Sequence, residues 1–246
     1  MSRLLVIGAT SAIARSVARL YAEQGARIFL VARDSVRLDA IADDLRVRGA
    51  VGVDSLAVDM TDHDRHPEII AAAFDALSGL DTVLVAHGIL PDQQECQDSV
   101  DAALYSMDVN FLSVVALLTP LANRMEQDRR GTIAVISSVA GDRGRQSNYI
   151  YGSAKSGLDA FLQGLRNRLF KANVNVLTIK PGFVDTPMTA HIEERGALWA
   201  SADDVAAGIV TAIEKRKDVV YLPRFWSLIM LIIRSIPEVI FKRLSL

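Results

Sequence analysis

The sequence predicts an α/β fold, a single domain built on one doubly wound sheet of seven parallel strands. Short apolar runs alternate with helix-length segments along the chain. Several of these runs are apolar at every position, as strands that are covered on both faces must be. The chain has 246 residues and is half apolar, which is enough for one large core. Such alternation forms right-handed βαβ units, which bind ligands at the carboxyl ends of their strands.

The expected strands and helices follow one another in regular order. The seven strands lie at residues 4–7, 27–31, 54–58, 82–86, 132–137, 175–179 and 219–222. The helices lie at residues 12–24, 36–46, 67–77, 99–127, 150–171 and 203–215. Pro67 stands at the start of the third helix, where its missing N–H is not needed. We therefore expect residues 1–222 to form the domain and residues 223–246 to form an apolar C-terminal extension.

Composition argues against several classes of protein. The net charge is −2 and the basic residues are scattered, so no nucleic-acid-binding face is expected. Cys96 is the single cysteine, which rules out an intrachain disulfide and favours a reducing compartment. The histidines show no metal-ligand spacing with Asp or Glu, so we expect no metal. The first residues lack the apolar core of a signal peptide, and a cytoplasmic location is expected.

A turn of small residues joins the first strand to the first helix. This turn contains Gly8, Thr10, Ser11 and Ile13. Small residues let backbone N–H groups and the positive end of the helix face a pyrophosphate. The same segment also fits an ordinary tight turn, so it predicts dinucleotide binding only in combination with other motifs.

A group of residues typical of proton transfer follows the fifth strand. Ser138 lies at the carboxyl end of this strand, and Tyr151 and Lys155 follow on a helix. Because they are four residues apart, Tyr151 and Lys155 lie on the same helix face. We expect the ammonium group to lower the pKa of the phenol, so that Tyr151 can exchange a proton with a substrate oxygen. Ser138 can hydrogen-bond the same oxygen. A Tyr–Lys pair alone is also typical of an ordinary helix surface, but the serine and the later Lys-Pro-Gly segment at residues 180–182 favour catalysis.

With these motifs, the chain resembles the short-chain dehydrogenase/reductase family over residues 4–222. Ser138, Tyr151 and Lys155 match the family's catalytic residues. Asn110 matches its helical asparagine, whose carbonyl holds a proton-relay water beside the lysine. The resemblance implies a Rossmann-type domain that transfers a hydride between a nicotinamide cofactor and a ketone or secondary alcohol.

The resemblance also implies a cofactor site that draws on several loops. It comprises Gly8, Thr10, Ser11, Ile13, Asp59, Met60, Gly88, Tyr151, Lys155, Pro181, Gly182, Val184 and Thr186. Ala12 and Ala14 depart from the family, which usually has glycine at both positions, and the Ala12 methyl would point toward the pyrophosphate. His87 lies in a Val-Ala-His-Gly segment where the family usually shows Asn-Asn-Ala-Gly, and we expect it to be structural.

The end of the second strand bears on the choice of cofactor. An NAD enzyme usually has an acidic residue there, which binds the ribose hydroxyls. Here Ala32 and Arg33 occupy this place, and an arginine can pair with the 2′-phosphate of NADP. We therefore expect NADP(H). NAD(H) is the alternative, in which Asp34 takes the acidic role and Arg33 only forms a surface ion pair.

The C-terminal extension combines an apolar run with basic residues. The run at residues 225–233 is about half as long as a membrane-spanning helix, and Arg234 and Pro237 end it. It could pack on the domain, at a subunit contact or at a membrane surface. We expect it to lie beside the active-site cleft and to contact a lipid-linked or otherwise apolar substrate, with a peripheral contact at the inner membrane face. Its sequence also resembles the C-terminus of keto-reductase subunits of decaprenylphosphoryl-ribose 2-epimerases.

Two hypotheses about function follow. The first is an NAD(P)-dependent enzyme that acts on a ketone or alcohol. The second is a cofactor-sensing or scaffold protein that keeps the fold without the activity. The complete Ser–Tyr–Lys–Asn set favours the enzyme, because a binding protein does not need a tuned phenol. The helices around Asn110 and Tyr151 form the usual subunit contacts in similar enzymes, so we expect a homodimer or homotetramer.

Overall fold

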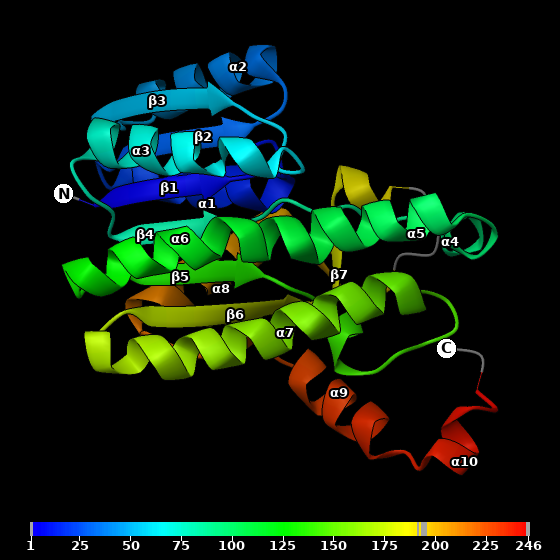
Figure 1. Ribbon diagram of the computed structural model, residues 1–246. Helices are drawn as coiled ribbons and strands as arrows, with labels where there is room; N and C mark the ends of the chain where they lie inside the picture. Colours follow the sequence, from blue (N-terminus) through cyan, green and yellow to red (C-terminus); the bar gives the residue numbers. More distant parts are fainter. Residues whose placement is uncertain (1, 191, 193–195, 245–246) are drawn as a thin grey trace.

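The structure is a computed structural model that describes residues 2–190, 192 and 196–244. A central sheet carries helices on both faces (Figure 1). Its strands lie in the order β3-β2-β1-β4-β5-β6-β9, and all neighbouring pairs are parallel. They are β1 (Arg3–Ile7), β2 (Arg27–Ala32), β3 (Gly52–Ala57), β4 (Thr82–Val85), β5 (Thr132–Ile136), β6 (Asn175–Pro181) and β9 (Val219–Leu222). The predicted fold class and its seven strands are confirmed.

The strand order creates a crevice between β1 and β4. From β1 the chain continues to β2 and then β3 on one side, and it returns to form β4 on the other side of β1. The connections that leave β1 and β4 therefore diverge at the carboxyl ends of these strands, where α/β sheets of this kind bind their ligands.

The two faces of the sheet have separate cores. Helices α1 (Ala12–Glu23), α2 (Ser35–Val47) and α8 (Ala202–Glu214) cover one face, while α3 (His66–Leu77), α6 (Ser113–Asp128) and α7 (Tyr149–Leu169) cover the other. Strand β1 shows how the sequence allows this. Leu4 and Val6 belong to the first core, Leu5 and Ile7 belong to the second, and all four are completely buried.

The single long helix predicted at residues 99–127 is wrong, because the structure divides it. Helix α5 (Val100–Met107) is followed by a π-helical turn, Asp108–Leu112, and then by α6; a short helix, α4 (Gln93–Asp98), precedes them. The continuous segment Val100–Asp128 is long and apolar enough to cross a membrane. Yet Leu117, Leu118 and Leu121 of α6 are completely buried against the sheet. We conclude that α6 is a core helix of the domain.

The chain after β6 contains elements that the sequence did not suggest. Strands β7 (Phe183–Asp185) and β8 (Trp199–Ser201) pair in a separate two-stranded sheet. After β9, helices α9 (Trp226–Ser235) and α10 (Glu238–Phe241) extend away from the sheet (Figure 1). Trp226 and Met230 of α9 pack against Val139, in the 3-10 turn Val139–Asp142 that follows β5. Residues 245–246 of the predicted extension lie outside the described residues.

Candidate active site

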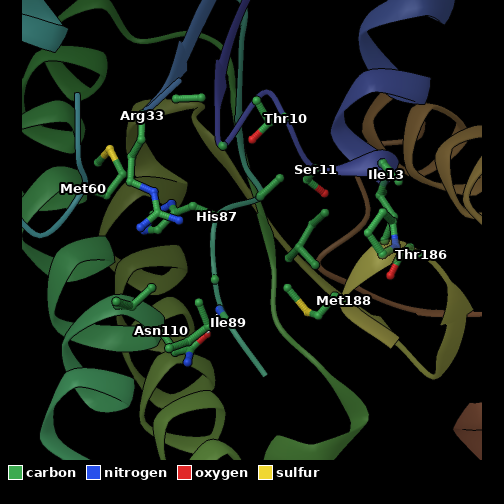
Figure 2. Close-up of a pocket in the computed structure, with 18 of the residues that line it drawn as sticks. Thr10, Ser11, Ile13, Arg33, Met60, His87, Ile89, Asn110, Thr186 and Met188 are labelled. Carbon is green, nitrogen blue, oxygen red and sulfur yellow. Dashed lines mark hydrogen bonds between the residues drawn. The ribbon is translucent and has the colours of Figure 1, made fainter. Parts of the chain in front are cut away.

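A cleft with a volume of about 290 Å³ opens at the carboxyl ends of the strands around the β1–β4 crevice. Most of the predicted site residues line it: Gly8, Thr10, Ser11, Ile13, Arg33, Asp59, Met60, Gly88, Asn110, Tyr151, Lys155 and Thr186. Figure 2 shows Thr10, Ser11 and Ile13 on one side of it, with Arg33 and Met60 across from them. Ser138, Pro181, Gly182 and Val184 are not among the lining residues.

Gly8 makes the close approach between the β1–α1 turn and the segment just after strand β4 possible. Its φ is +81°, and a Cβ at this position would lie 2.5 Å from the backbone nitrogen of His87. Only glycine combines this backbone conformation with this contact. Helix α1 then begins at Ala12, which lines the cleft, and Ser11 makes no side-chain cap. The first N–H groups of α1 are thus placed as in anion sites at helix N-termini, and Ala14, by contrast, is buried in the core.

The end of the cleft beside β2 carries two arginines. Arg33 is well exposed, and its Nη1 atom lies 3.6 Å from Oδ2 of Asp59. Burial acts to raise the pKa of Asp59, but hydrogen bonds from Thr61 and the charge of Arg33 outweigh it and hold the pKa below its usual value. Arg37 also lines the cleft, although the sequence did not single it out. The described part of the chain thus brings two cations to this end.

Asp34 has a structural role that competes with cofactor binding. It is the N-cap of α2, and its carboxylate accepts a hydrogen bond of 3.0 Å from the backbone N–H of Arg37. Asp34 does not line the cleft. This arrangement speaks against the alternative in which Asp34 binds the ribose hydroxyls of NAD.

Tyr151 and Lys155 lie on α7 and face the cleft together. The Lys155 ammonium is 5.7 Å from the centroid of the Tyr151 ring and donates a hydrogen bond of 3.2 Å to the carbonyl of Ile136. Ser138 forms a side-chain hydrogen bond with Tyr151, so it contacts the phenol although it does not itself line the cleft. Its Oγ also accepts from the N–H of Ala140, which fixes its orientation at the start of the turn after β5.

The electrostatics of this pair differ from the sequence prediction. Burial raises the pKa of Tyr151 to about 12, although the hydrogen bond with Ser138 acts in the lowering direction. Burial also lowers the pKa of Lys155 to about 8, and the charge of Asp159 opposes that change. The predicted lowering of the Tyr151 pKa is therefore not found, because desolvation outweighs any help from the lysine. At neutral pH Tyr151 is a protonated phenol beside a mostly protonated amine.

Asn110 and Gly88 bring the helix α5–α6 junction close to Lys155. Asn110 is completely buried in the π-helical turn, its Oδ1 accepts from the N–H of Ile89 at 3.1 Å, and its Nδ2 donates to the carbonyl of Ser106 at 3.0 Å. A Cβ at Gly88 would lie 2.8 Å from Asn110 Oδ1 and 3.7 Å from Lys155 Nζ. The side-chain amide thus holds Asn110 in place, and the resemblance implies that a carbonyl of this residue holds the relay water. π-helical turns disturb the regular helix pairing and often mark functional sites.

A buried ionic cluster lies behind Lys155, and the sequence analysis missed it. Lys180 bonds to the carboxylates of Asp142 and Asp159, the latter at 2.7 Å. Tyr221 donates to the second oxygen of Asp142 at 2.8 Å, and Ser137 donates to Asp159 at 2.6 Å. The three charged side chains are at most 10% exposed. Asp159 lies one helical turn after Lys155, which was the available sequence signal.

The loop after β6 divides its predicted residues between two roles. Thr186, with its neighbours Pro187 and Met188, lines the cleft. Gly182 instead lies against the tail, since a Cβ at this position would be 1.9 Å from Nε1 of Trp226. Val184 is buried in the core that also contains α8. The absence of a side chain at Gly182 is thus what allows Trp226 to dock.

His87 lines the cleft but has the properties of a structural residue. Its Nε2 lies 2.9 Å from Oγ of Ser113. Ser113 donates its single hydroxyl proton to the carbonyl of Val109, so His87 Nε2 is the donor in this contact. Burial and the charge of Lys155 lower the pKa of His87 to about 3, which keeps the imidazole neutral.

Comparison with known proteins agrees with this geometry. Residues 2–196 match a protein family described as short chain dehydrogenase. The chain belongs to the short-chain dehydrogenase family. Uncharacterized oxidoreductases from Streptomyces coelicolor and Mycobacterium tuberculosis are each 34% identical to it and span 98% of this chain and 95% or 96% of their own. One from Staphylococcus epidermidis is 28% identical over 85% of this chain and 89% of its own. The protein is thus an oxidoreductase of a family that generally uses NAD(P), and the family match ends before α9.

Proposed function

We propose that the protein transfers a hydride between NADP(H) and a ketone or secondary alcohol, with Tyr151 as the proton donor or acceptor. One observation carries this proposal. Tyr151, Lys155 and Asn110 line one end of a cleft, with Ser138 hydrogen-bonded to Tyr151, and the other end carries a glycine turn, a helix N-terminus and two arginines. When bound, the nicotinamide supplies or accepts the hydride at the substrate carbon.

The cleft residues fit such a cofactor. Gly8 lets the turn pack against the backbone of His87, and helix α1 begins at Ala12 at the wall of the cleft, where its first N–H groups can bind a pyrophosphate. Arg33 and Arg37 give two cations for a 2′-phosphate, and Asp34 is already used as a helix cap. These contacts support NADP(H) over NAD(H).

The catalytic residues have distinct roles in the proposed reaction. In the direction of reduction, Tyr151 gives its hydroxyl proton to the carbonyl oxygen. A phenol with a pKa of about 12 is fully protonated at neutral pH, which suits this step. Ser138 holds the same oxygen, and the Lys155 ammonium stabilises the phenolate that is left behind. The backbone carbonyl of Asn110 would hold the water through which Tyr151 regains its proton.

The substrate is proposed to be apolar or lipid-linked, in a cytoplasmic enzyme. Met188 lines the cleft, and Phe183 lies in the same segment after β6, which we call the substrate-side loop. Both side chains are apolar and exposed. The resemblance of the tail to keto-reductase subunits of decaprenylphosphoryl-ribose 2-epimerases makes a polyprenyl-phosphate-linked keto sugar one candidate. The test set should therefore contain both small soluble ketones and lipid-linked ones.

The deciding experiment compares wild type with Tyr151→Phe and Tyr149→Phe. Tyr149 lies two residues earlier on α7, is 41% exposed and does not line the cleft, so its substitution is a matched control. We expect Tyr151→Phe to keep NADPH affinity in a fluorescence titration and to lose turnover by a factor on the order of 10² or more. Tyr149→Phe should be normal in both. Full turnover in Tyr151→Phe would remove the tyrosine from the mechanism, and wild type that binds NADPH without reducing any ketone would favour the cofactor-sensing hypothesis.

A further inference from the structure

Helices α9 and α10 present an apolar face that the rest of the described chain leaves exposed. On α9, Trp226 and Met230 point inward and are almost completely buried. On the opposite side, Leu228, Leu231 and Ile232 are each about 60% exposed. In α10, Val239 and Ile240 are 64% and 54% exposed. From this face we propose that residues 224–243 form a docking surface for an anionic lipid bilayer.

The charges around this face favour an anionic partner. Arg224, Arg234, Lys242 and Arg243 are all exposed. Glu238 is the single acidic residue of the segment, and its carboxylate is paired with Arg143 at 2.9 Å. The segment is thus apolar on one side and carries four basic groups with one neutralised acid. This is the composition of helices that lie in a bilayer interface, where basic groups meet anionic headgroups.

The dimensions of the segment favour an interfacial position over a spanning one. Ten residues of α9 make a helix about 15 Å long, about half the thickness of the hydrocarbon core of a bilayer. The chain then turns at Pro237 into α10, whose Phe241 is buried under the Arg143 guanidinium at 3.6 Å from the ring centroid. Arg143 also donates to the carbonyls of Ile233 and Ile236, at 2.7 Å and 2.5 Å. These contacts hold the two helices to the domain, so the exposed apolar side chains are presented on a fixed support.

A second copy of the chain is a poorer occupant than a bilayer. Pairing this segment with itself by a twofold axis would bring together two segments that both carry a net positive charge. Like charges at close range oppose such an interface, whereas phosphate or carboxylate headgroups neutralise them. Helices α9 and α10, which carry these exposed apolar side chains, also project from the domain in Figure 1, as a surface that enters a bilayer must.

An aromatic chain connects the docking surface to the cleft. Trp226 meets Phe183 edge to face, with centroids 5.5 Å apart, and Phe183 stacks on Trp199 at 5.3 Å. Phe183 leads along the same loop to Thr186 and Met188, which line the cleft. Docking would place the substrate side of the cleft near the headgroup region, so that an apolar carbonyl compound enters from the lipid. This last step rests on the function proposed above.

The test is sedimentation of the full chain with vesicles, which needs no enzymatic turnover. Vesicles of phosphatidylcholine with phosphatidylglycerol are compared with phosphatidylcholine alone. Wild type should bind the anionic vesicles, and binding should weaken as salt is raised. Leu231→Asp/Ile232→Asp and Lys242→Glu/Arg243→Glu should each bind at least tenfold more weakly. The control is Val47→Asp/Val51→Asp, which places two charges on exposed valines at the end of α2 and just before β3, the edge strand opposite β9, and should bind like wild type.

Thermal melting of each variant shows whether the fold is kept, and the outcomes separate the possibilities. No binding of wild type to anionic vesicles overturns the proposal, as does equal loss in the Val47/Val51 control. If the Leu231/Ile232 variant has a lower mass than wild type in light scattering without vesicles, the face is a contact with a second copy of the chain, and this result also overturns the proposal. Vesicle binding without turnover would leave the docking surface standing and count only against the proposed function. If the protein both binds vesicles and turns over ketones, vesicles should lower the KM for an apolar ketone and leave the KM for a small soluble ketone unchanged.

Discussion

Asp159→Asn should shift the pH dependence of the enzyme and also reduce its stability. The amide keeps the size of the carboxylate and can still accept from Ser137, but it removes a charge that supports both Lys180 and Lys155. Lys180 keeps Asp142 as a partner, so the cost in the free energy of unfolding should be about 1–3 kcal/mol rather than the full cost of an unpaired buried charge. Asp142→Asn makes a similar change and is the matched control.

The two variants should separate in their pH profiles. Asp159 raises the pKa of Lys155, whose folded value is about 8, and Asp142 is not among the groups that act on it. Lys155 works as the ammonium, so activity is present below this pKa and is lost as the pH rises through it. Without the Asp159 charge the Lys155 pKa falls further, and the upper limb of kcat/KM should move toward lower pH.

The measurements are urea unfolding at one pH and kcat/KM from about pH 6 to 9.5. Asp159→Asn should lose stability and shift the upper limb, while Asp142→Asn should lose stability and keep the limb where it is in wild type. An equal shift in both variants would show that the effect is a general loss of structure. An unchanged limb in Asp159→Asn would show that Asp159 does not set the charge of Lys155.

Three more predictions concern cofactor, turn and assembly. Arg33→Ala and Arg37→Ala should each weaken NADPH roughly tenfold or more and leave NADH nearly unchanged in titrations, since only NADPH carries the 2′-phosphate; equal weakening of both cofactors would contradict this. Gly8→Ala should lower the melting temperature and the affinity for either cofactor, because its Cβ would lie 2.5 Å from the His87 nitrogen at a φ of +81°; a normal melting curve would argue against the tight packing. Light scattering should give a homodimer or homotetramer that Leu104→Asp weakens, since Leu104 is 61% exposed on α5; a wild-type monomer at micromolar concentration would refute this.

The strands could be predicted closely because their signal is local. Strand β1, for example, is apolar at all four positions from Leu4 to Ile7, and the predicted strand ends differ from the observed ones by at most two residues. The division of the long helix could not be predicted in this way. Residues 108–112 contain no proline or glycine, and the π-helical turn coincides with the contact of Asn110 to Ile89, a residue from another part of the chain.

The site could be predicted where its residues are close in sequence or match a family motif. Tyr151 and Lys155 are four residues apart, and Ser138 ends the preceding strand. For the cluster of Asp142, Asp159 and Lys180, the spacing from Lys155 pointed only to Asp159; the full cluster was missed because its members come from three elements that the fold brings together. The direction of the Tyr151 pKa was also wrong, because the degree of burial around two side chains is a property of the folded chain.

The contact between Gly182 and Trp226 makes the evolution of the tail depend on that of the domain. A side chain at position 182 would occupy the place of the indole, so a tail that docks through tryptophan can only be inherited together with glycine at this position. A chain without the tail no longer needs glycine at position 182 and could accept a larger residue at that position. Among relatives, loss of the tail should therefore precede substitution of the glycine. The pair at positions 182 and 226 is a marker that would show, in any sequence of this kind, whether the last helices still rest against the substrate-side loop.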